Sequence, residues 1–118
     1  MNEGPECLLM RDELRDTMKG SITNWVFSGG KYTEEDPSGF FSFSRSLPLT
    51  VKEIGCKGML IYFILERDGD VQYIIHDKCD GRWQLTYDPY CVWFVELNNG
   101  VTLWYSCDSG TESLVFTD

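Results

Sequence analysis

Hydrophobic residues near the start of the chain recur every three or four positions, which is the spacing of one face of an α-helix. Pro5 suits the first turn of a helix, and Gly20 suits the position just past its end. The pattern therefore predicts a helix over residues 5–19. Its apolar stripe consists of Leu8 or Cys7, followed by Met10, Leu14 and Met18.

The rest of the chain shows runs of β-branched and aromatic residues separated by turn sequences. Asn98-Asn99-Gly100 is a strong hairpin signal, because Asn and Gly tolerate the positive φ that tight turns need. Residues 21–28 and 40–44 predict two early strands, and 51–58 is ambiguous between a short helix and an irregular crossing. Six further strands are expected at residues 59–66, 71–76, 82–87, 91–97, 101–107 and 111–117.

Several expected strands are apolar on both faces, unlike a sheet with one face in water. In residues 59–66, Ile61 and Phe63 alternate with Leu60 and Tyr62. The second face must be covered by the helix, or the sheet must curl. We therefore expect an α+β fold in which the N-terminal helix packs on a strongly curved antiparallel meander sheet of six to eight strands, up to a half or full barrel. The length suits a single domain over residues 1–118.

Charge is distributed unevenly along the 118 residues, whose formal net charge is −9. Residues 1–82 hold all ten Lys and Arg, whereas residues 83–118 hold five acidic and eight aromatic residues. Such a region repels phosphate backbones and attracts a basic partner. Trp104 shares its strand face with Thr102 and Ser106, so it is the tryptophan for which exposure is expected most. The partner-binding residues predicted from this pattern are Asp88, Glu96, Trp104, Asp108 and Glu112.

Motifs for catalysis or metal binding do not stand out. The five cysteines form no CxxC pair, and His76 is the sole histidine, which disfavours a zinc site or a cysteine–histidine nucleophile. Asp68-Gly69-Asp70 matches a hairpin turn better than a calcium loop. We predict no catalytic residue, no metal and no cofactor, and we expect reduced thiols in a cytoplasmic protein. Neither a signal peptide nor a membrane-spanning run is visible.

The charge pattern favours a small acidic protein that neutralises a basic protein partner by direct contact. Such a protein would be an immunity or antitoxin-type inhibitor of a nuclease toxin, or an inhibitor that mimics nucleic acid. It would bind neither nucleic acid nor membrane, and it would not be an enzyme. Two alternatives remain open at this point: a carrier of small apolar ligands with a lipocalin-like curved sheet, and a carboxylate-dependent hydrolase.

Overall fold

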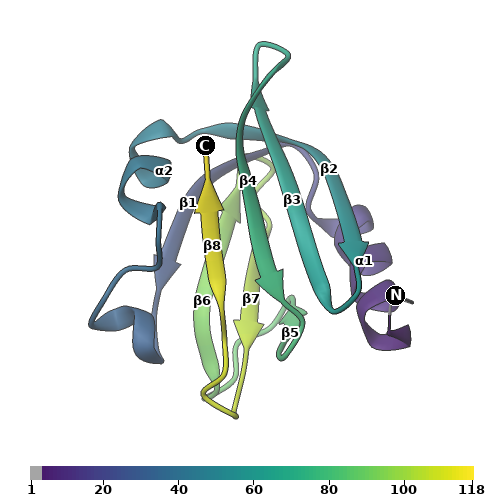
Figure 1. Cartoon of the computed structure of the whole chain (residues 1–118), viewed down its shortest axis with the longest axis vertical. Coiled ribbons are helices and arrows are strands. Elements are labelled where there is room, and N and C mark those ends of the chain that lie inside the picture. The colour runs from purple at the N-terminus through teal and green to yellow at the C-terminus, as the bar shows by residue number, and fades with distance from the viewer. Residues whose placement is uncertain (1–3) are drawn as a thin grey trace.

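The computed structural model describes residues 4–118, which contain two α-helices, a short 3₁₀ helix and eight strands (Figure 1). The helices are α1 (Pro5–Thr17), η1 (Lys31–Thr33) and α2 (Phe40–Ser46). The strands are β1 (Ser21–Phe27), β2 (Leu49–Lys57), β3 (Leu60–Arg67), β4 (Asp70–Lys78), β5 (Arg82–Gln84), β6 (Cys91–Leu97), β7 (Thr102–Ser106) and β8 (Leu114–Thr117).

The eight strands form one antiparallel sheet in the order β5-β7-β6-β1-β2-β3-β4-β8. Figure 1 shows β2, β3, β4 and β8 in front of β1, β6, β7 and β5, so the sheet makes two layers joined where β1 pairs with β2. The expected antiparallel sheet is confirmed. The expected simple meander is wrong, because β4 pairs with β8 and β5 pairs with β7. A closed barrel is also wrong, because β5 and β8 end the strand order without pairing with each other.

Helix α1 confirms the prediction from the apolar stripe, although it ends at Thr17, two residues early. Cys7, Met10 and Leu14 are buried, and the chain turns away at Gly20 with a φ of 89°. The helix lies beside β2, where Arg15 Nε donates a hydrogen bond of 2.8 Å to the carbonyl oxygen of Ile54. Helix α1 therefore covers one side of the layered sheet and fixes the position of β2.

Residues 40–44, expected as a strand, instead form helix α2. Gly39 precedes it in the left-handed region with a φ of 82°, which sets the direction of the first turn. Phe43 is fully buried among Trp25 and Phe116, whereas Phe41 is 57% exposed. In a strand, Phe41 and Phe43 would lie on the same face and would be buried alike. In the helix they point in different directions, so one is buried and the other is exposed.

Aromatic rings from both layers fill the space between them. Trp25 of β1 meets Phe116 of β8 at a centroid distance of 5.3 Å, and Phe63 of β3 meets Trp83 at 5.6 Å. Trp93 and Tyr105 stack at 4.1 Å. The space between the two layers is thus filled by side chains. None of the helices in residues 4–118 is both long and apolar enough to cross a membrane.

Candidate functional site

The front layer consists of β2, β3, β4 and β8, and the back layer consists of β1, β6, β7 and β5. A hollow of about 500 Å³ lies on the outer face of the front layer, over β2, β3 and β4. Its polar groups are a lysine, a tyrosine and a histidine, and its apolar wall comes from the β2–β3 turn. Met59 and Leu60 in that wall are 47% and 39% exposed. The lining residues are Lys57, Gly58, Met59, Leu60, Tyr62 and His76.

The register of the front layer brings these side chains together from three strands. Tyr62 of β3 lies opposite Gly55 of β2 and His76 of β4, so the three positions form one row across the sheet. Lys57 and Lys78 flank Leu60 in the next row on the same face. Side chains two residues apart on a strand share a face, and therefore both rows point away from the aromatic core.

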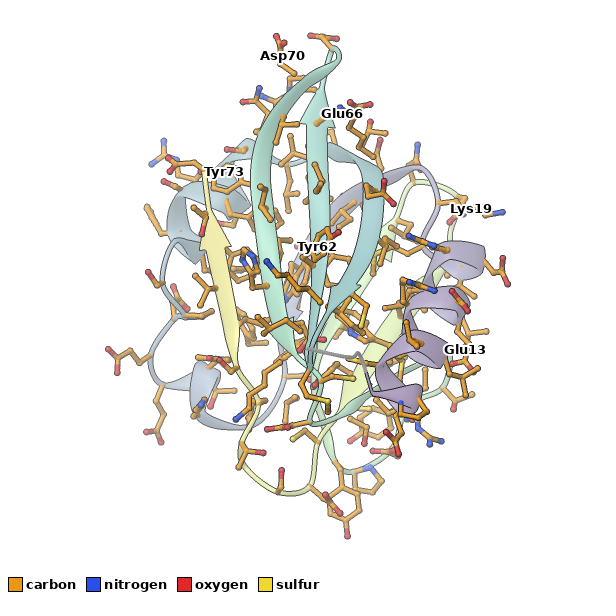
Figure 2. The ribbon with its side chains drawn as sticks, turned by 45° about the vertical axis from the view of Figure 1, so that its right-hand side comes forward. Glu13, Lys19, Tyr62, Glu66, Asp70 and Tyr73 are labelled. Carbon is orange, nitrogen blue, oxygen red and sulfur yellow. The ribbon has the colours of Figure 1, made fainter. Side chains whose placement is uncertain are left out.

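The glycine at position 55 shapes the hollow. A methyl group at Gly55 would overlap the ring and hydroxyl of Tyr62, so the ring lies directly over this residue. Figure 2 shows Tyr62 on the outer surface of the front layer, away from Lys19 at the end of α1. The missing side chain at Gly55 thus allows the Tyr62 ring to form part of the wall of the hollow.

The hollow carries positive charge in a protein that is acidic as a whole. Lys57 is exposed, and within residues 4–118 it makes no ion pair. Lys78 is held by Asp80 at 3.6 Å. The nearest acid along β2, Glu53, is paired with Arg15 at 3.2 Å. Lys57 is therefore the cation of the hollow that has no acidic partner among residues 4–118.

Three of the residues predicted as a partner-binding surface lie on the outer face of the back layer. Trp104 is half-buried against Tyr87 and Phe94, at 5.1 and 4.8 Å. Glu96 pairs in register with Thr102, which shares the face of Trp104.

Asp88 also lies on this face, because Ser106 Oγ donates to its carboxylate at 3.0 Å. The hydrogen bond from Gln84, with others from Tyr90, Ser106 and Cys91, holds the pKa of Asp88 below its ordinary value.

The other two predicted residues do not join this group. Asp108 is exposed beyond the end of β7. Glu112 is only 1% exposed, so it contributes no contact area to a surface. A binding role for the group Asp88, Glu96 and Trp104 stays a prediction.

A buried acid lies beneath the hollow, on the core side of β4. Asp77 is 1% exposed and accepts a hydrogen bond of 2.9 Å from Trp83 Nε1. Burial raises the pKa of Asp77 from 3.8 to about 8, against the lowering effect of Trp83 and Tyr105. The acid therefore carries its proton at neutral pH, which removes the cost of burying a charge.

Three cysteines come together near the start of α1. Burial, followed by the neighbouring thiols of Cys79 and Cys56, raises the pKa of Cys7 above its ordinary value. The Cys7 thiol therefore stays protonated and is a poor nucleophile. Across residues 4–118, no three His, Cys, Asp or Glu side chains are arranged to hold a metal ion.

Comparison with known proteins gives a likeness of fold and not of sequence. No protein-family model matches the chain, and no curated protein sequence matches it. Solved structures do match. The MutM (Fpg) protein of Thermus thermophilus superposes with a TM-score of 0.76 over 98% of this chain and 40% of its own, at 17% identity. The fold is that of part of the Fpg proteins.

Further Fpg structures give the same result. The formamidopyrimidine-DNA glycosylase of Lactococcus lactis, bound to DNA containing an AP site, matches with a TM-score of 0.77 and 16% identity over 98% of this chain and 45% of its own. MutM in complex with DNA containing carbocyclic 8-oxo-G matches at 0.74 and 14%, over 98% of this chain and 43% of its own. The chain thus spans less than half the length of the Fpg structures it matches.

This likeness overturns the function predicted from charge. The chain was expected to be an immunity or antitoxin-type inhibitor that does not bind nucleic acid, but its structural neighbours are DNA glycosylases solved with DNA. The alternative of an apolar-ligand carrier fails on the fold, because aromatic side chains fill the space between the two layers. The prediction against nucleic-acid binding rested on the net charge and on the acidic C-terminal third. Net charge sums all groups, whereas a ligand responds to the charges near it. Because the Debye length is about 10 Å in 0.1 M salt, acids on the far layer are screened from the hollow.

Proposed function

We propose that this chain is a DNA-binding domain. The observation that carries the proposal is the superposition of 98% of the chain on Fpg glycosylases that were solved in complex with DNA. The likeness extends over nearly the whole chain rather than over one motif. The proposal is one of binding and assigns no catalytic residue.

The charge around the hollow supports the proposal and suggests where DNA is held. Lysine ammonium groups neutralise phosphates and release counterions, which supplies most of the affinity of non-specific binding. Lys57 and Lys78 lie on one face, and no acid in residues 4–118 forms an ion pair with Lys57. Because the chain as a whole has a net charge of −9, which opposes the approach of DNA, binding should be moderate and strongly dependent on salt.

Fluorescence anisotropy of labelled duplex and single-stranded DNA tests this function. We expect binding at low salt that weakens as salt is added, because phosphate contacts dominate. The double variant Lys57→Glu, Lys78→Glu should reduce the slope of log affinity against log salt by about two, one for each lost contact.

Lys19→Glu is the matched control for the single variant Lys57→Glu, since it makes the same charge change at the end of α1, away from the hollow. Its salt slope should stay close to that of the wild type. Absence of binding to either DNA at low salt would exclude the proposed function.

We also propose a reducing, cytoplasmic location for the protein. All five cysteines are free, and Cys7, Cys91 and Cys107 are buried. Titration of thiols in protein purified without reductant checks this, with five thiols per chain expected after denaturation.

A further inference from the structure

Beyond DNA binding in general, we propose that the hollow between Lys57, Tyr62 and His76 receives one unpaired nucleobase, which makes single-stranded DNA the preferred ligand. This inference rests on the proposed function and specifies the ligand of its site. It follows from the shape, the lining and the charge of the hollow, each of which restricts what can bind there.

The lining suits the flat face of a base. Tyr62 supplies an aromatic ring, and Met59 and Leu60 supply an exposed apolar wall beside it. A volume of about 500 Å³ lies within the range of small-molecule sites, roughly 300–1,000 Å³. Bases stack on aromatic side chains whatever their sequence, because every base has a π-face.

The charges suit the backbone on either side of that base. Lys57 and Lys78 flank Leu60 in one row, with β3 between their strands, so their Cα atoms lie about two strand spacings, or roughly 10 Å, apart. Two phosphates of one strand can therefore be contacted while a base between them lies on Tyr62. His76, opposite Tyr62 in the register, adds a further hydrogen-bond donor to the same hollow.

Duplex DNA fits this hollow poorly. In a duplex both faces of each base are covered by neighbouring pairs, so a base must leave the stack before its face can reach Tyr62. A single strand has already lost that pairing. A neutral apolar ligand would leave Lys57 and Lys78 without an anionic ligand group to contact, so the charge favours a nucleotide over such a ligand.

The test compares a short fluorescent oligothymidylate with the same strand in a duplex, using the whole chain and anisotropy at fixed low salt. The wild type should bind the single strand more tightly. Tyr62→Ala should weaken single-strand binding about ten-fold, in keeping with the loss of one stacked base, while Tyr62→Phe should retain it. Tyr90→Ala is the matched control, since Tyr90 is 59% exposed and lies outside the hollow.

Gly55→Ala is a second variant, and it substitutes none of the residues that line the hollow. Its methyl group must displace the Tyr62 ring, which swings at low cost because it is the far end of a side chain. Single-strand affinity should fall while the thermal unfolding midpoint stays near that of the wild type.

The outcomes separate the two proposals. If the wild type binds single-stranded DNA but Tyr62→Ala and Gly55→Ala bind it equally well, this site is excluded and the DNA-binding function stands. Tighter binding of the duplex overturns the single-stranded ligand. If the wild type binds neither DNA, the function and the site both fail.

Discussion

Asp77 shows how one buried side chain can make the stability of the whole fold depend on pH. Its carboxyl group is 1% exposed, with Oδ2 bonded to Trp83 and Oδ1 without a partner among the described residues. The pKa is raised to about 8 by burial, while an unburied aspartate titrates near 3.8. The unfolded chain therefore loses this proton at a much lower pH than the folded chain does.

The sign of the pH dependence follows from that difference. Between the two pKa values the folded protein binds more protons than the unfolded chain, so its free energy of unfolding falls as pH rises. The stabilisation is complete below the unfolded pKa and is lost as pH rises through the folded pKa near 8.

Replacing Asp77 by Asn tests this at the residue scale, because Asn keeps an acceptor for Trp83 and cannot ionise. From about pH 5 to pH 8, the wild-type free energy of unfolding should fall by at least about 1 kcal/mol more than that of Asp77→Asn. Urea unfolding at several pH values measures both. Parallel curves for the two proteins would show that Asp77 is ionised in the folded state.

At the scale of elements, the sequence predicts what repeats regularly and misses what depends on packing. Helix α1 and strand β1 are recovered, as are the hairpins β3–β4 and β6–β7, because their periodicity and turns are local. Strand β2 was ambiguous because its pairing shifts register between Val51 and Glu53, which interrupts the alternation.

Helix α2 is missed for a different reason. Its alternating Phe and Ser fit a strand as well as a helix, and burial of Phe43 against Trp25, Tyr73 and Phe116 decides the outcome. The same limit affects strand order, since the pairing of β1 between β6 and β2 rests on contacts between distant segments.

Substitutions in α2 distinguish the helix from the strand expected there. Phe43→Ala should lower the free energy of unfolding by about 3–5 kcal/mol, because it leaves a cavity among aromatic rings. Phe41→Ala should change it by less than about 1 kcal/mol, because Phe41 is 57% exposed. Chemical denaturation measures both, and equal losses would indicate a strand face that buries the two rings together.

At the scale of the whole molecule, the proposed binding of DNA depends on where charges lie rather than on their sum. All Lys and Arg precede residue 83, whereas the prediction from charge rests on the acidic residues that follow it. The sequence does not indicate that Lys57, Tyr62 and Lys78 form a group, since only the register of β2, β3 and β4 brings them to one face. The alternation of side chains along each strand shows which residues share a face of that strand. It does not show which strands are neighbours, so it cannot identify the group by itself.

We propose that DNA binds this fold at the outer face of β2, β3 and β4. Backbone amide chemical shifts of isotope-labelled protein, recorded while single-stranded DNA is added, test it most directly. We expect the largest shifts around Lys57, Leu60, Tyr62, His76 and Lys78, and little change on the outer face near Trp104. Shifts centred on β6 and β7, or no shifts at all at low salt, would contradict it.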